Sequence, residues 1–421
     1  MAQPLRFEPD LDFIREVMRA GGDTVKKCYQ CATCSVVCPL SPDDRPFPRK
    51  EMILAQWGLK DKLAADPDIW LCHNCSDCST QCPRGAKPGD VLNALRKKAI
   101  ESHSFPQALA RRVGNPKSLG VLLGVPALGL LVIIAFTNLW WWGDAVEGER
   151  DGRPVEAVLV RGQEVVLADG IRSWEMVPLQ VVDTIFILTA LLALGVLGAG
   201  AFRFWRSLER ERPRQMGLIP AALEVFEEIC YHRNFRECGT SPDRYLGHLG
   251  VFYGVAALFA TTACVFLGIY ALGLVVRVPL TPWPVWNPIK LLGNLGGLAL
   301  MAGCLLLIRE RLRADKEKTR SWYFDWFLLG LLLAAAASGL LAEWARWSGI
   351  GFLYYLLYFV HLVLVWSLLA YSPYSKLAHP VYRTVALVHA KACGRYLMQQ
   401  APVVFLSSEG PATDERTSAS R

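Results

Sequence analysis

Two cysteine runs near the N-terminus carry the most specific chemistry in this sequence. The second run repeats the spacing of the first, Cys-x2-Cys-x2-Cys-x3-Cys-Pro. A cubane iron–sulfur cluster needs four thiolates, and in the bacterial two-cluster pattern three come from one run and the fourth from the other. We therefore assign a first [4Fe–4S] cluster to Cys28, Cys31, Cys34 and Cys82. The second is assigned to Cys72, Cys75, Cys78 and Cys38.

A pair of zinc sites is the alternative interpretation, because two CxxC pairs can also hold zinc. Zinc needs no third CxxC step, so the repeated spacing followed by proline favours clusters. Two neighbouring clusters pass single electrons, which predicts a relay and not a catalytic centre. Eight of the 13 cysteines lie in these runs. Their grouping favours metal ligation in a reducing compartment over disulfides, and the N-terminal residues show no signal peptide.

Histidines near membrane-type segments form the second set of candidate ligands. Ionisable side chains in a membrane span are costly and mark function. His361 and His379 are 18 residues apart, five helical turns, so they would share a face with about 27 Å of rise on an unbroken helix. We expect Pro373 to bend that helix. His248 matches His379 in depth, and the two could bind one haem b axially.

A second haem is predicted less directly, because His361 has no partner at its own depth. The alternative pairs are His232 with His379 and His248 with His361, provided that the third span begins near Pro242.

The elements that must position these residues are six apolar segments. They cover 118–139, 179–201, 246–273, 288–308, 324–343 and 352–372. Each is long enough to cross about 30 Å of hydrocarbon. The loop 202–245 holds eight basic residues and 309–320 holds six, whereas 143–178 has four arginines against eight acidic residues. The positive-inside rule therefore places both termini and the iron–sulfur domain in the cytoplasm, at the inner membrane.

The net charge of +7 is explained by the membrane topology, because the basic residues cluster beside the apolar segments. Nucleic-acid binding is therefore not expected. The predicted fold is mainly α. A small two-[4Fe–4S] ferredoxin-like domain (1–104), with helices at 8–20, 49–64 and 88–101, leads through a basic linker (105–117) to a six-span bundle (118–400). The outer segment 154–169 should form a hairpin around Arg161-Gly162, and 401–421 should be a disordered tail.

Two stretches resemble known families. The segment from His361 to His379 looks like the last span of the cytochrome b (gamma) subunit of respiratory nitrate reductase, over a core of about 220–395. The resemblance implies two haems b ligated by these histidines. That family carries a further pair of histidines ten residues apart; His248 matches one, but position 258 is Leu, which leaves the outer haem without that ligand.

The stretches KKCYQCATCSVVCP and WLCHNCSDCSTQCPRGAKPGD are similar to the C subunit of heterodisulfide reductase. The fusion of both halves resembles the C subunit of the quinone-interacting membrane-bound oxidoreductase complex. The resemblance implies electron exchange between menaquinone and cytoplasmic flavin and iron–sulfur proteins like the A subunit of heterodisulfide reductase, with adenylylsulfate reductase as a further partner in sulfate reduction.

Two other functions fit the sequence. The chain could serve a heterodisulfide-reductase-like or sulfite-reduction-linked complex, although it contains no Cys-Cys-Gly motif for a disulfide-cleaving centre. It could also be a haem-free membrane anchor, in which case the histidines would only pack. No catalytic residue and no quinone site can be assigned from the sequence. As candidates for the quinone site, Lys290, Trp283 and Trp286 are no better than their neighbours.

Overall fold

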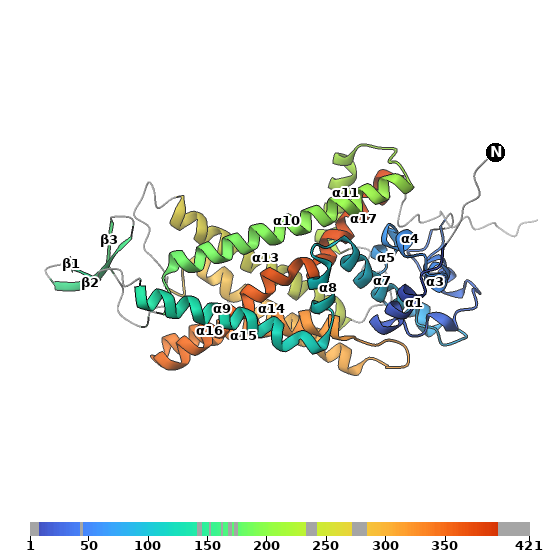
Figure 1. Cartoon of the computed structure of the whole chain (residues 1–421). Helices are drawn as coiled ribbons and strands as arrows, with labels where there is room; N and C mark the ends of the chain where they lie inside the picture. The colour runs from blue at the N-terminus through green and yellow to red at the C-terminus, as the bar shows by residue number, and fades with distance from the viewer. Residues whose placement is uncertain are drawn as a thin grey trace, which may run out of the picture.

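The structure is a computed structural model. It describes residues 8–42, 45–140, 145–150, 153–160, 163–166, 171, 176–232, 242–271 and 284–394. Figure 1 shows the N-terminal domain at one end of a helix bundle and three short strands at the other. The predicted tail 401–421 lies outside the described residues.

The N-terminal domain is built from short helices around one apolar core. Val17, Phe47, Met52 and Trp70 are fully buried there. Its helices are α1 (Leu11–Val17), α2 (Thr33–Val36), α3 (Arg49–Gln56), α4 (Lys60–Ala64), α5 (Asp68–Leu71), α6 (Asp77–Thr80) and α7 (Pro88–His103). Helix α8 (Gln107–Val113) follows and packs against the membrane helices.

The single helix predicted for 49–64 is wrong. Helix α3 ends at Gln56 and α4 begins at Lys60, with Gly58 between them at φ +67. An added Cβ at Gly58 would lie 2.5 Å from the carbonyl oxygen of Asp10. Glycine is therefore required for both the left-handed backbone and the close approach of the chain.

A buried charge cluster joins α3 to the start of α5. The Lys50 ammonium lies 3.1 Å from Glu51 Oε1, 2.9 Å from Asp66 Oδ2 and 2.6 Å from Asp68 Oδ2. The Glu51 and Asp68 side chains are fully buried. Burial lowers the pKa of Lys50, but the three carboxylates around it outweigh this effect and raise it. Burial in turn raises the pKa of Glu51 and that of Asp66, because a single ammonium cannot balance three buried negative charges.

Six helices are long and apolar enough to cross a membrane, as predicted, and the protein is a multi-pass membrane protein. They are α9 (Leu119–Trp140), α10 (Leu179–Glu211), α13 (Pro242–Tyr270), α14 (Pro288–Arg313), α15 (Tyr323–Trp347) and α16 (Gly351–Tyr371). Helix α13 begins at Pro242. This is the helix start that the alternative pairs, His232 with His379 and His248 with His361, require.

Glycines allow α13 and α14 to pack at backbone distance. A Cβ added at Gly303 would lie 2.6 Å from the Val251 amide nitrogen, and one at Gly254 would lie 2.7 Å from that of Leu300. Small residues at such positions are typical of membrane helix pairs, which associate through close van der Waals contact.

The sixth span does not continue unbroken to His379. Helix α16 ends at Tyr371, two short 3-10 turns cover 372–378, and α17 (His379–Ala392) starts a new helix. Pro373 lies at the break, where its missing N–H and its clash with the preceding residue disfavour a continuous α-helix. His361 and His379 therefore do not share one helical face.

A further helix and a three-stranded sheet lie outside the spans. Helix α11 (Leu218–Tyr231) packs against α17. Between α9 and α10, strands β1 (Ala145–Arg150), β2 (Arg153–Val160) and β3 (Gln163–Val166) form an antiparallel sheet. Strands β2 and β3 pair from Val160 with Gln163, so the hairpin predicted around positions 161 and 162 is confirmed.

Candidate redox centres and the junction between the domains

The two cysteine loops repeat one backbone conformation. In the first loop Gln30 and Ala32 have positive φ (67° and 69°), and in the second Asn74 and Ser76 occupy the equivalent positions (54° and 76°). Non-glycine residues rarely adopt this region, and such strain clusters at ligand-binding sites. Each loop thereby turns its first three cysteines around a common centre.

The two loops surround separate cavities. One cavity is lined by Cys72, Cys75 and Cys78 together with Cys38 from the other run. A second cavity is lined by Cys28, Cys31, Cys34 and the exchanged Cys82. The structure thus brings together the same two sets of four cysteines that the spacing assigned to the second and the first cluster.

Burial disfavours the thiolate form of three of these cysteines. Burial raises the pKa of Cys34 to about 11 and that of Cys38 to about 12, and it holds the pKa of Cys78 well above its usual range. At the exposed Cys31 a hydrogen bond with Thr33 Oγ1 (3.3 Å) lowers the pKa. Iron would supply the missing positive charge, and its binding would release protons. The donor set and the enclosure suit an iron–sulfur cluster.

Three arginines from three helices converge on the loop that carries Cys72 and Cys75. Arg96 on α7 donates to the carbonyls of Ile69 and Cys72. Arg383 on α17 donates to the Trp70 carbonyl (2.7 Å) and contacts His73 Nε2 (2.9 Å).

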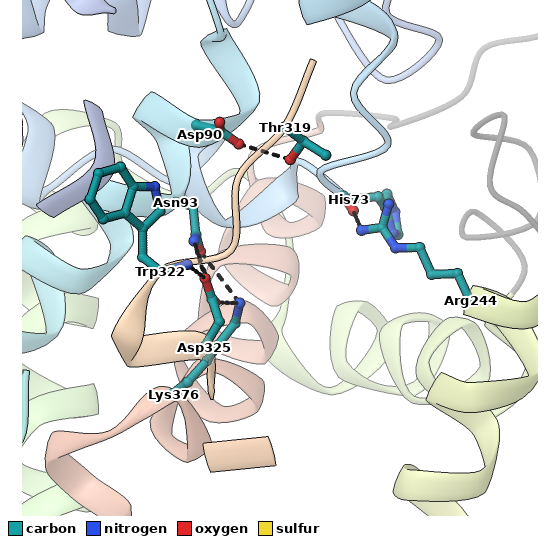
Figure 2. Close-up of polar contacts among 8 residues, drawn as sticks. All are labelled: His73, Asp90, Asn93, Arg244, Thr319, Trp322, Asp325 and Lys376. Atoms are coloured by element: carbon teal, nitrogen blue, oxygen red, sulfur yellow. Dashed lines mark hydrogen bonds and ion pairs between the residues drawn. The ribbon is translucent and has the colours of Figure 1, made fainter. Parts of the chain in front are cut away.

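Arg244, in the first turn of α13, completes this set. Its two terminal nitrogens donate to the carbonyls of Asn74 (2.7 Å) and His73 (2.6 Å). Figure 2 shows the contact with His73. The loop that carries Cys72 and Cys75 is therefore held against α13 by Arg244 and against α17 by Arg383.

A buried ion pair fixes the other side of the junction. Asp325, at the start of α15 and 4% exposed, accepts hydrogen bonds from the Lys376 ammonium and from Asn93 Nδ2 (3.2 Å) on α7. Beside it, the carboxylate of Asp90 accepts from Thr319 Oγ1 (3.0 Å) and from the Arg320 amide (3.1 Å). Burial nevertheless raises the pKa of Asp90 to about 6.

Three of the four predicted haem ligands gather near this junction. The rings of His232 and His248 lie 4.9 Å apart between centroids. His248 also lies near enough to His379 to contribute, with Arg96, Arg383 and Lys376, to the low pKa of His379, whose largest cause is burial. Within the part of the chain that the structure describes, the His379 Nδ1 is buried without a hydrogen-bond partner, so this nitrogen is available to bind a further group.

His361 lies elsewhere, on α16 against α15. Its Nδ1 is 3.0 Å from the Ala335 carbonyl oxygen and 3.2 Å from Ser338 Oγ. A Cβ on the neighbouring Gly339 would lie 2.8 Å from His361 Cε1. The bond to a carbonyl places the proton on Nδ1 and leaves Nε2 as the ligand atom, as in metal-bound histidines.

Sequence reasoning did not identify the aromatic link between the two halves. Trp70, two residues before Cys72, has its ring centroid 5.6 Å from that of His379 and stacks at 5.1 Å on Tyr382. The one sequence feature that could have indicated this link is the position of Trp70, an aromatic residue close to the second cysteine run. Lys290, an undistinguished quinone candidate in the sequence, forms an ion pair with Glu343 (2.9 Å). Trp286 is 81% exposed, and Trp283 lies outside the described residues.

Comparison with known proteins agrees with both halves of this arrangement. Residues 24–86 match the 4Fe-4S dicluster domain family. Residues 163–400, more than half of the chain, match the family described as Citrate utilization protein B. The chain belongs to the citrate utilization protein B family. The Escherichia coli protein of that name is 25% identical over 334 residues, which cover 76% of this chain and 80% of that protein.

This family member also has relatives that match its N-terminal part alone. The C subunit of the H(2):CoB-CoM heterodisulfide,ferredoxin reductase of Methanothermobacter marburgensis is 37% identical over 107 residues, 25% of this chain and 57% of that relative. The second iron–sulfur C subunit of the CoB–CoM heterodisulfide reductase of Methanocaldococcus jannaschii is 35% identical over 113 residues, again 25% of this chain and 59% of the relative. The chain therefore spans little more than half the length of these relatives. No solved structure matches.

The comparisons support a redox role. The dicluster match supports [4Fe–4S] clusters in this member of the citrate utilization protein B family, and the relatives from heterodisulfide reductases support an iron–sulfur electron-transfer role.

Proposed function

We propose that this chain passes single electrons between a membrane quinone, menaquinone in our hypothesis, and cytoplasmic partner proteins, through two [4Fe–4S] clusters and haem b. The clusters and the haem, when bound, each accept and release one electron. The protein's part is to hold these groups at fixed distances and to shield them from water. The quinone is the only substrate that we assign to the chain itself.

The cluster ligands in this proposal are the two cysteine sets assigned from the spacing. Their grouping around two separate cavities supports the assignment.

The observation that carries the proposal is the contact between Trp70 and His379. It places a proposed haem ligand one ring contact away from the loop of the second cluster, across the junction between the two halves. An anchor without haem would not need an unpartnered buried histidine nitrogen at this position. We assign His248 and His379 to the inner haem, with His232 beside His248 as the alternative ligand.

A second, outer haem is proposed at His361. Its Nδ1 bond to the Ala335 carbonyl supports ligation through Nε2. The partner ligand is unassigned, since position 258 is Leu and no ring contact joins His361 to the other three histidines within the described part of the chain.

The proposed placement is the cytoplasmic membrane, with both termini and the iron–sulfur domain (1–104) in the cytoplasm and the six-span domain at 118–400. The basic loops 202–245 and 309–320 support this orientation. Helix α8 lies within the proposed linker 105–117 and buries Ala110 and Val113 against the spans.

For the soluble side we propose flavin and iron–sulfur proteins like the A subunit of heterodisulfide reductase, with adenylylsulfate reductase as a more distal partner. A second candidate follows from the match over 163–400 and from the Escherichia coli relative's name: the partner would be an oxidoreductase that serves citrate utilisation.

The test is cofactor content per chain in the purified protein. We expect eight irons in clusters and a b-type haem spectrum that a menaquinol analogue reduces. The substitution His379→Ala should remove the inner haem, and His361→Ala should remove a second haem while the first is retained. His232→Ala tests the alternative ligand.

The matched control is His389→Ala on α17, whose ring bonds the Arg212 carbonyl (3.0 Å) and is not a proposed ligand. It should leave haem content unchanged. If the wild-type protein shows no haem absorption, the helix bundle is only a membrane anchor. If the haem content of His361→Ala equals that of wild type, His361 is not a haem ligand.

A further inference from the structure

The two cysteine cavities differ in what covers them. The cavity of the second cluster is held against α13 and α17 through Arg244 and Arg383. The cavity of the first cluster reaches the surface: its lining includes Tyr29, 57% exposed, and the exposed Cys31. A chain of redox centres whose inner end is held by the membrane domain must exchange electrons with soluble proteins at its outer end.

The surface around the first-cluster cavity is basic and partly aromatic. Three exposed residues line the cavity, Tyr29, Arg49 and Pro83. Together with the exposed Arg84, which follows Pro83 and contacts Tyr29, they form what we call the rim. The Arg84 guanidinium carbon lies 5.9 Å from the Tyr29 ring centroid. Among the residues that the structure describes, none that lines this cavity is acidic. Two further exposed lysines, Lys26 and Lys27, directly precede Cys28.

We propose that the rim is the docking surface for a redox protein with an acidic face. The proposal rests on the proposed electron relay, and it names the partner class that meets the first cluster. Tyrosine and arginine are the residue types that dominate binding energy in protein interfaces. Opposite charge on the partner would steer its approach and speed association at low ionic strength.

The step at this surface is a one-electron transfer. The partner's reduced centre loses one electron, the first cluster passes from its 2+ to its 1+ state, and no bond is made or broken. The rim residues would bring the partner's centre close to Cys31, the cysteine of this set that is exposed.

A competing role for the rim arginines is local compensation of the cluster's negative charge. That role predicts that charge reversal alters cluster assembly or reduction by small molecules. The docking role predicts that small molecules are unaffected and that only protein donors react more slowly.

The experiment compares two reductants on the full chain in lipid nanodiscs. One is dithionite and the other is a reduced, acidic plant-type [2Fe–2S] ferredoxin, used as a one-electron protein donor. For wild type we expect a second-order rate with ferredoxin that falls steeply with salt. The double variant Arg49→Glu and Arg84→Glu should lower that rate at least tenfold at low salt, with the dithionite rate and the iron content unchanged.

Two variants serve as controls. Arg84→Lys keeps the charge and should keep most of the rate. Lys60→Glu reverses an exposed charge on α4 outside the cavity lining and should change the rate less than twofold.

The docking proposal fails if ferredoxin does not reduce the wild type while dithionite does. It fails as well if the double variant and Lys60→Glu slow the reaction equally, or if the double variant slows dithionite to the same extent. A wild type that dithionite cannot reduce would instead refute the proposed relay.

Discussion

The arginines around the cavity of the second cluster should raise the reduction potential of the cluster proposed there, and Arg244 allows the clearest test. It donates two hydrogen bonds to the carbonyls of His73 and Asn74, between two proposed ligands of that cluster, Cys72 and Cys75. Reduction adds one negative charge to a group already ligated by four thiolates. A nearby guanidinium therefore favours the reduced state.

The size of the effect follows from Coulomb's law. At a separation of about 8 Å and an effective dielectric constant of about 20, a unit charge contributes about 2 kcal/mol. For a one-electron couple, in which a tenfold change in equilibrium constant is about 59 mV, this is about 90 mV. We expect Arg244→Met to lower the potential of the second cluster by about 50–100 mV and to leave the first cluster within about 20 mV.

The assay is a redox titration of the full chain followed by electron paramagnetic resonance. Arg244→Lys retains the charge and should restore most of the potential. Arg309→Met is the matched control. Arg309 is 50% exposed and forms an ion pair (2.7 Å) with Asp243, the residue that precedes Arg244 in the sequence. Equal shifts of both clusters, or a shift in Arg309→Met as large as in Arg244→Met, would refute the electrostatic reasoning.

Three further predictions concern stability. Gly303→Val should cost more than about 2 kcal/mol because its side chain meets the α13 backbone. Gly330→Val, with open space around its Cβ position, should cost much less in thermal unfolding; equal losses would disprove backbone-distance packing. Lys50→Met should destabilise the iron–sulfur domain by about 3–5 kcal/mol, since it strands three buried carboxylates; denaturation followed by cluster absorbance checks this, and a loss below about 1 kcal/mol contradicts it. Burial raises the pKa of Asp90 from an ordinary 3.8 to about 6. The stability that the protonated Asp90 contributes is therefore fully present below about pH 4 and is lost as pH rises from about 4 through 6. Between about pH 4 and 6.5 the melting temperature of wild type should fall relative to Asp90→Asn, and parallel pH profiles would exclude this account.

Spacing alone predicted the features whose chemistry is local. The spacing assigned Cys38 to the second cluster and Cys82 to the first, because the fourth cysteine of each run cannot reach the cluster that its own tight loop binds. The spans followed from hydropathy, and the outer hairpin from its alternation around positions 161 and 162. These patterns depend on neighbours within a few residues.

The remaining features depend on contacts between distant segments. Arg96, Arg244 and Arg383 look like ordinary basic residues until folding brings them to one loop. The position of His379 depends on a helix break at Pro373, whose extent no periodicity reveals. The aromatic contact of Trp70 joins residues more than 300 positions apart. Such contacts are set by tertiary packing, on which local propensity has little influence.

The anchoring of the iron–sulfur domain has a kinetic consequence. Arg244, Arg383 and Lys376 fasten it to three different segments of the membrane half, and its apolar core continues into α10 and α17 through Phe204 and Tyr382. A domain held in this way cannot swing between donor and acceptor as a mobile carrier does. Electrons must tunnel across a fixed gap, so their transfer inside the protein should proceed at the same rate in water and in viscous glycerol solutions.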